Sequence, residues 1–122
     1  MRIVVVDDDE EVLLILRAMF QRQGHEVLAY GNPLDCPIFT SVACPCSPVA
    51  VCPDIIISDI DMPKVDGVEF VTRVIDKACR CRKVAFLSGH MLSDDLLALL
   101  AKTKVKFFQK PLDIVSFNEW LM

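Results

Sequence analysis

Five polar residues directly follow short apolar runs, and their chemical types suit metal and phosphate chemistry. They are Asp7, Asp8, Asp59, Ser88 and Lys110. A carboxylate can coordinate a hard cation or attack an electrophile. Several carboxylates at one place repel each other and raise their pKa values unless a cation compensates. If the fold gathers these residues, the sequence therefore predicts a cation beside a nucleophilic carboxylate.

The predicted chemistry is phosphoryl transfer. Asp7, Asp8 and Asp59 form an all-oxygen set suited to Mg²⁺, and the cation would let an anionic phosphoryl donor approach Asp59. Lys110 supplies a positive charge and the Ser88 hydroxyl a hydrogen-bond donor. Phosphoryl transfer requires such an in-line nucleophile, a metal and fixed donors for the equatorial oxygens.

Alternating strand and helix patterns must position these residues. The Ile55–Ile57 run has no polar alternation, which is typical of a strand buried on both faces. The predicted strands are Ile3–Val6, Glu26–Tyr30, Ile55–Asp59, Lys83–Ser88 and Val105–Gln109. Helices are predicted at about 10–23, 65–78 and 93–102, with a last helix carrying Ile114, Phe117 and Trp120. This pattern predicts an α/β fold with a doubly wound five-stranded parallel sheet and helices on both faces. The strand tips share one edge in such a sheet, so the five polar residues should converge there.

Length and composition limit the remaining possibilities. The 122 residues predict a single domain, 1–122, with an irregular segment rich in Cys and Pro at about 36–53. Any helix in this segment should be short, at most about 34–43. The net charge of −4 argues against direct nucleic-acid binding. No apolar run approaches the ~18 residues of a membrane span, and no signal peptide is recognisable. We therefore expect a cytoplasmic protein without membrane contact.

Four motifs in order resemble one family over essentially the whole chain. They are Val5-Val6-Asp7-Asp8, Ser58-Asp59-Ile60-Asp61-Met62-Pro63 with Asp66-Gly67, Leu87-Ser88-Gly89, and Phe107-Phe108-Gln109-Lys110-Pro111. The sequence thereby resembles the receiver domain of bacterial two-component response regulators. Thr103, Lys104 and Val105 replace the family's usual glycine pair before the fifth strand. The resemblance implies a flavodoxin-like sheet with strand order 2-1-3-4-5.

The resemblance also implies a role for each site residue. Asp59 would accept a phosphoryl group from a sensor histidine kinase or phosphotransfer protein. Asp8, Asp59 and the backbone carbonyl of Asp61 would bind Mg²⁺ directly, and Asp7 mainly through water. Lys110 would pair with a phosphate oxygen, and its bond to Pro111 would be cis. Ser88 would move toward the phosphate, and Phe107 would turn inward as the switch aromatic residue.

Further expectations concern the lifetime of the phosphoryl group and the partners. Asp61 and His90 lie two residues beyond the acceptor and the switch hydroxyl, and they either set that lifetime or are plain loop residues. The face made by the fourth helix, fifth strand and fifth helix is expected to contact a downstream protein, an output domain or a second copy in a homodimer. The apolar residues Leu96, Leu97, Leu99 and Leu100 suggest this face.

The cysteines suggest a second metal site. Cys44-Pro45-Cys46 precedes the third strand and Cys79-Arg80-Cys81 the fourth, so both pairs should lie at the end of the sheet opposite Asp59. Cys44, Cys46, Cys79 and Cys81 could together bind a tetrahedral Zn²⁺, with Cys52 as a competing ligand. An iron–sulfur cluster, a redox-sensing disulfide and simple reduced thiols are the alternatives.

Two other functions compete with the signalling interpretation. The first is a small phosphohydrolase of the haloacid-dehalogenase type, because Asp59-Ile60-Asp61 has that family's Asp-x-Asp spacing. That family places the motif on its first strand, whereas an acidic doublet precedes it here. The second is a degenerate receiver that acts only as a metal- or redox-sensing interaction module. The favoured reading remains a phospho-acceptor that is not an enzyme with an external substrate.

Overall fold

The chain alternates strands and helices from end to end. The computed structural model describes residues 1–40, 52–75, 81, 83–89 and 93–121. Its elements are β1 (Arg2–Val6), α1 (Glu10–Arg22), β2 (Glu26–Tyr30), the 3₁₀ turn η1 (Pro33–Asp35), α2 (Pro37–Thr40), β3 (Ile55–Ser58), α3 (Gly67–Ile75), β4 (Lys83–Ser88), α4 (Asp94–Lys102), β5 (Lys106–Gln109) and α5 (Ile114–Leu121). The predicted strands are all present within a residue of their expected bounds.

The five strands form one parallel sheet in the order β2-β1-β3-β4-β5. β1 and β3 are direct neighbours, with Val6 opposite Ser58. β4 and β5 pair so that Ser88 lies opposite Gln109. The residues that follow β1, β3 and β5, together with Ser88 at the end of β4, therefore lie along one edge. The predicted fold class and strand order are confirmed.

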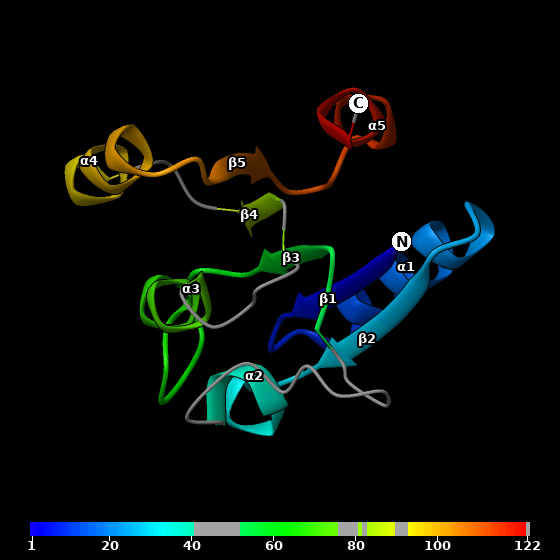
Figure 1. Ribbon diagram of the computed structural model, residues 1–122, viewed down its shortest axis with the longest axis horizontal. Helices are drawn as coiled ribbons and strands as arrows, with labels where there is room; N and C mark the ends of the chain where they lie inside the picture. The colour runs from blue at the N-terminus through cyan, green and yellow to red at the C-terminus, as the bar shows by residue number, and fades with distance from the viewer. Residues whose placement is uncertain (41–51, 76–80, 82, 90–92, 122) are drawn as a thin grey trace.

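Two apolar layers cover the two faces of the sheet. Successive strand residues point to opposite faces, so Val4 and Val6 pack with Phe70 of α3, whereas Ile3 and Val5 pack with Phe20 of α1. Figure 1 shows α1 and α5 on one side of the sheet, and α2, α3 and α4 on the other. Because both faces are covered, the Ile55–Ile57 run is buried throughout, as a strand without polar alternation requires.

Side-chain caps fix the starts of three helices. Asp9 Oδ1 accepts the backbone N–H of Glu11 at 2.9 Å, and Ser93 Oγ accepts that of Leu96 at 3.2 Å. Asp66 Oδ1 accepts the N–H of Glu69 at 2.8 Å, so α3 begins at Gly67. The predicted start of this helix at residue 65 was two residues early. The Asp66 side chain caps the helix, so the residues before Asp66 belong to the preceding turn.

The segment before β3 contains little helix among its described residues. The turn η1 and the four-residue α2 are separated at Cys36, whose backbone is extended. Residues 41–51 of the predicted irregular segment lie outside the described residues. The helices of the described part of the chain are all too short or too polar to span a bilayer.

Candidate functional site

Three carboxylates meet where β1 and β3 end. Asp7 and Asp8 follow β1, and Asp59 follows β3 beside it; the Asp59 N–H donates to the carbonyl of Val6 at 2.8 Å. Each of the three side chains offers an oxygen, and these oxygens all lie within 4.8 Å of one another. Asp7 and Asp59 are buried, whereas Asp8 is exposed. The predicted convergence of these three residues is therefore present in the structure.

The Lys110 ammonium group joins this cluster from β5. The Lys110 N–H donates to the carbonyl of Ser88 at 2.8 Å, which holds the start of the loop against β4. The next peptide bond, to Pro111, is cis, as expected. Lys110 Nζ lies 2.8 Å from Asp7 Oδ2 and 3.5 Å from Asp59 Oδ1. The ammonium group thus pairs more closely with Asp7 than with the predicted acceptor.

Burial and mutual repulsion favour the neutral form of Asp59, the predicted acceptor, more than in a free aspartate. Desolvation, the Asp7 charge and a hydrogen bond with Asp8 raise the pKa of Asp59 from 3.8 to about 6, against the opposing effects of Lys110 and of the Ile60 N–H. Burial lowers the pKa of Lys110, but its hydrogen bond to Asp7 and the charges of Asp7 and Asp59 outweigh burial and raise it. Lys110 is therefore positive while part of the carboxylate charge remains uncompensated.

The residues fit a small hard cation. Asp7 Oδ1 accepts the N–H of Asp9 at 2.9 Å. Asp7 Oδ2 is buried and pairs with the Lys110 ammonium group at 2.8 Å. One lysine faces three carboxylates, so the cluster carries excess negative charge. Mg²⁺ prefers carboxylate oxygens and keeps several water ligands, and the exposed Asp8 leaves room for water at the site.

Gly67, which the sequence analysis gave only as part of a motif, packs against the site. A Cβ at this position would lie 1.8 Å from the carbonyl oxygen of Asp59 and 2.8 Å from the Cα of Ile60. The Gly67 N–H also donates to the carbonyl of Ile60 at 2.8 Å. The first turn of α3 therefore packs directly on the backbone that carries Asp59. An Asp-Gly pair is typical of a turn, but this contact joins residues eight positions apart and is visible only in three dimensions.

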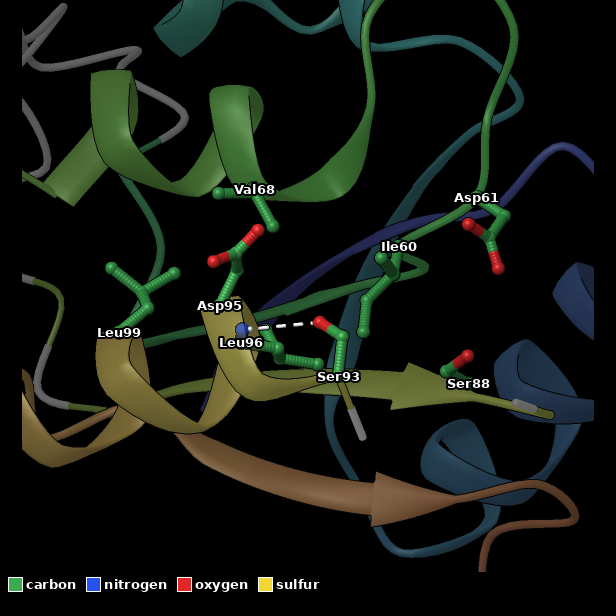
Figure 2. Close-up of a pocket in the computed structure, with 8 residues that line it drawn as sticks. All are labelled: Ile60, Asp61, Val68, Ser88, Ser93, Asp95, Leu96 and Leu99. Carbon is green, nitrogen blue, oxygen red and sulfur yellow. Dashed lines mark hydrogen bonds between the residues drawn. The ribbon is translucent and has the colours of Figure 1, made fainter. Parts of the chain in front are cut away.

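Ser88 and Asp61 line a cavity of about 220 Å³ beside the carboxylate cluster. Figure 2 shows Asp61 on the loop after β3, Ser88 at the tip of β4, and the cap residue Ser93 with the α4 residues Asp95, Leu96 and Leu99 on the other side. Ser88 is buried and Asp61 is exposed. Phe107 is half-buried on β5 opposite Phe86 and packs against the core cluster that contains Val84 and Leu96. His90 lies outside the described residues.

The predicted zinc ligands are mostly outside the described residues as well, since these do not include Cys44, Cys46 or Cys79. Cys81 is half-buried, and its Sγ donates to the carbonyl of Lys83 at 3.3 Å. Burial is the main cause that raises the pKa of the Cys81 thiol to about 11, and the nearby Cys52 contributes. The zinc site remains a prediction.

The raised pKa of Asp59 makes the stability of the metal-free protein depend on pH. The folded protein favours the neutral form of the Asp59 carboxyl. The unfolding free energy is therefore higher at low pH and falls as the pH rises from 3.8 to about 6. The full shift corresponds to about 3 kcal/mol. We predict that Asp59→Asn raises the unfolding free energy by about 1–3 kcal/mol at pH 7.5 without Mg²⁺.

The same substitution should have almost no effect at pH 3.5, where the wild-type carboxyl is neutral in the folded protein and mostly neutral in the unfolded chain. Urea unfolding at the two pH values in EDTA measures both quantities. An equal change in unfolding free energy at both pH values would show that relief of burial and charge repulsion at Asp59 is not the cause of the stabilisation. Adding Mg²⁺ should stabilise the wild-type protein and leave Asp59→Asn nearly unchanged.

Comparison with known proteins agrees with this architecture. The family model described as response regulator receiver domain matches residues 3–121. The chain is 26% identical over 121 residues to sporulation initiation phosphotransferase F of Bacillus subtilis (strain 168), covering 97% of this chain and 88% of that protein. It is 24% identical over 116 residues to nisin biosynthesis regulatory protein NisR of Lactococcus lactis subsp. lactis, covering 93% of this chain. The match spans only 45% of NisR, so the chain corresponds to less than half of that protein.

Solved structures share the same fold. The receiver domain from the hybrid histidine kinase CckA superposes with a TM-score of 0.71 at 26% identity, covering 99% of this chain and 95% of that one. A receiver domain protein from Methanospirillum hungatei JF-1 gives a TM-score of 0.77 at 18% identity, with 98% and 89% covered, and supports the fold alone. With its sheet order, its carboxylate cluster and a family match over residues 3–121, the chain belongs to the response regulator receiver domain family.

Proposed function

We propose that the protein is a phospho-acceptor whose Asp59 takes a phosphoryl group from a phosphohistidine on a sensor histidine kinase or phosphotransfer protein. The P–N bond of the donor breaks, a P–O bond forms to an Asp59 oxygen, and the imidazole leaves. The observation that carries this proposal is the position of Asp59, buried at a strand tip between two carboxylates and the Lys110 ammonium group. The phosphotransferase named among the relatives supports a phospho-acceptor role.

The chain's own residues prepare Asp59 for this reaction. The Ile60 N–H donates to Asp59 Oδ1 at 2.8 Å, which orients the carboxylate and leaves the other oxygen for attack. Lys110 Nζ, between Asp7 and Asp59, can turn to an oxygen of the incoming phosphoryl group. Mg²⁺ held by Asp8, Asp59 and the Asp61 carbonyl, with Asp7 acting through water, would offset the charge of the carboxylates and of the phosphoryl oxygens.

The signal would then pass through Ser88 and Phe107. Ser88 lies beside the cavity and can move its hydroxyl toward a phosphoryl group on Asp59. Phe107 is half-buried on the neighbouring strand and is the proposed switch aromatic residue. Asp61 at the cavity mouth, and His90 in the sequence, are proposed to tune the phosphoryl lifetime by their effect on attacking water.

The proposed output surface is the face made by α4, β5 and α5. Leu97 on α4 is 48% exposed, and Lys106 on β5 is also exposed, so an apolar residue and a charge are available to a downstream protein or output domain. We propose a cytoplasmic signalling protein that promotes only its own phosphorylation and dephosphorylation. Neither direct nucleic-acid binding nor membrane contact is part of this proposal.

The family match disfavours the competing functions. A haloacid-dehalogenase-type hydrolase would have its Asp-x-Asp motif after the first strand, whereas Asp59-Ile60-Asp61 follows β3 here. A degenerate receiver would lack part of the acceptor site, but Asp7, Asp8, Asp59 and Lys110 are all present and close together. A zinc site at Cys44, Cys46, Cys79 and Cys81 would be an addition to the phospho-acceptor function and not a replacement for it.

The decisive experiment is labelling with a small phosphoryl donor. Incubation with acetyl phosphate and Mg²⁺, followed by mass spectrometry, should show a single added phosphoryl group on the peptide that contains Asp59. Hydroxylamine should remove the group, because it cleaves acyl phosphates, and EDTA should prevent its addition. Labelling on serine, or steady turnover of a phosphate ester without a labelled protein, would contradict the proposal and favour the hydrolase.

A further inference from the structure

Ser58 is a buried polar residue that has no role in the site described so far. Among the residues that the structure describes, four polar or charged side chains are buried, and three of them, Asp7, Asp59 and Ser88, belong to the candidate site. Ser58 is the fourth and ends β3 directly before the proposed acceptor. Strand side chains alternate between faces, so Ser58 points to the same face of the sheet as Ile56, which belongs to the core cluster that includes α3. Burying a hydroxyl group costs free energy unless it is hydrogen-bonded, so the partner of Ser58 is informative.

The Ser58 hydroxyl binds the backbone of the acceptor itself. It donates a hydrogen bond to the carbonyl oxygen of Asp59 at 2.8 Å. The first turn of α3 packs on the same oxygen, since a Cβ at Gly67 would lie 1.8 Å from it. A buried carbonyl group without a hydrogen-bond partner is costly. The hydroxyl therefore supplies a partner where the packing of α3 leaves little room for water.

The peptide group between Asp59 and Ile60 connects this carbonyl to the reactive side chain. A peptide group is planar, so the direction of its C=O bond fixes the direction of its N–H bond. The N–H of this group belongs to Ile60 and donates to Asp59 Oδ1 at 2.8 Å. Because Ser58 holds the oxygen at one end of the plane, it aims the donor at the other end toward the Asp59 carboxylate.

The neighbouring peptide groups are held by backbone partners. The Asp59 N–H, in the preceding peptide group, donates to the carbonyl of Val6 at 2.8 Å. The carbonyl of Ile60, in the following peptide group, accepts the Gly67 N–H at 2.8 Å. In this set of contacts, Ser58 is the one side chain that takes part besides that of Asp59. A substitution at Ser58 can therefore loosen the central peptide group while the backbone contacts on both sides remain.

We propose that Ser58 is a positioning residue: its hydroxyl orients the Asp59–Ile60 peptide group, so that the Ile60 N–H holds one carboxylate oxygen of Asp59 and leaves the other directed at the phosphoryl donor. This role depends on the phospho-acceptor function proposed above. Ser58 is fully buried, so it acts through the peptide group and does not touch the donor. A nucleophile held in the productive orientation reacts faster, and a misplacement of about 1 Å can cost about a hundredfold in rate.

Two variants of nearly the same shape separate the hydroxyl from packing. Ser58→Thr keeps the hydroxyl, whereas Ser58→Val replaces it with a methyl group. With acetyl phosphate and Mg²⁺ at saturating donor, Ser58→Val should label at least about tenfold more slowly than Ser58→Thr. The donor concentration that gives half of the maximal rate should be similar in the two variants, because the hydroxyl does not contact the donor. Ile56→Val, a buried change on the same face of β3, controls for a general loss of stability and should label at the wild-type rate.

Amide hydrogen exchange followed by NMR tests the orientation of the peptide group without any phosphoryl donor. In Ser58→Ala, which removes the hydroxyl without adding bulk, the Ile60 amide should exchange at least about tenfold faster than in the wild-type protein. The Asp59 amide, bound to the carbonyl of Val6, should keep its protection.

The two measurements distinguish the role of Ser58 from the function of the site. A wild-type chain that acetyl phosphate does not label would contradict the phospho-acceptor function. A labelled wild-type chain with equal rates for Ser58→Thr and Ser58→Val would contradict the role of Ser58 alone. Unchanged exchange of the Ile60 amide in Ser58→Ala would also overturn that role, because the hydroxyl would then not control the peptide group.

Discussion

Asp59→Asn should abolish phosphoryl labelling by acetyl phosphate, with a fall of at least about a hundredfold in the rate. The substitution keeps the size of the side chain and an oxygen that can accept the Ile60 N–H. It removes the anionic oxygen that attacks phosphorus in the proposed reaction, and an amide cannot form the same acyl phosphate. Because the substituted side chain is neutral, we also expect the variant to fold at least as stably as the wild-type protein at neutral pH. Loss of labelling can then be assigned to chemistry and not to unfolding.

Asp9→Asn provides the matched control for this prediction. Asp9 is two positions from the carboxylate Asp7, but its side chain caps α1 through the N–H of Glu11. Asparagine is an equally good cap, so this variant should label at nearly the wild-type rate. Quantitative mass spectrometry over a time course measures the rate of labelling of the wild-type protein, Asp59→Asn and Asp9→Asn. Persistent labelling of Asp59→Asn, or labelling mapped to Asp8 in the wild-type chain, would exclude Asp59 as the acceptor.

Gly67→Ala should disrupt the site without changing any of its functional groups. The added methyl group would lie 1.8 Å from the Asp59 carbonyl oxygen and 2.8 Å from the Asp59 carbonyl carbon, both of which belong to the backbone. A flexible side chain could rotate away, but here the loop after β3 and the first turn of α3 must separate. We expect a loss of about 3–5 kcal/mol in unfolding free energy, together with at least tenfold slower labelling.

Gly31→Ala is the control for the loss of glycine itself. A Cβ at Gly31 would meet only the Asp7 carbonyl oxygen at 4.0 Å, an ordinary contact. Its effect on stability should therefore be within about 0.5 kcal/mol. Urea unfolding followed by tryptophan fluorescence, with Trp120 as the probe, compares the two variants. If Gly67→Ala were as stable as Gly31→Ala, the contact between α3 and the Asp59 backbone would not constrain the site.

Much of the architecture could be predicted from the sequence because it follows from local patterns. The unbroken Ile55–Ile57 run identified a strand covered on both faces, and the acidic residues after it and after Ile3–Val6 marked the strand ends. Parallel strands bring their ends to one edge, so the meeting of Asp7, Asp8 and Asp59 followed from the predicted topology. The start of α3 was less accurate, because Pro63 and Asp66 both signal turns and only the Asp66 side-chain hydrogen bond sets the boundary.

The exposed face of α1 could not be predicted fully from the sequence. Leu16 and Phe20 follow a helical period, and both are buried against the sheet. Leu14 and Ile15 are apolar too, and periodicity alone does not tell whether a neighbouring element covers them. In the structure, α1 lies beside β2 at the edge of the sheet, and no described element covers this side of the helix. Exposure depends on what surrounds a helix and not on its own periodicity.

The amino-acid sequence by itself determined the element types, the strand ends and which side chains reach the reactive edge, because these depend on residue periodicity and chain order. The tertiary structure decided the relations between side chains at that edge: that Lys110 lies closer to Asp7 than to Asp59, that Asp7 is buried while Asp8 is exposed, and that Gly67 packs on the Asp59 backbone. These relations depend on distances of a few ångströms between segments far apart in the chain. Such distances also set the charge state of Asp59, since desolvation and the nearness of Asp7 together raise its pKa to about 6.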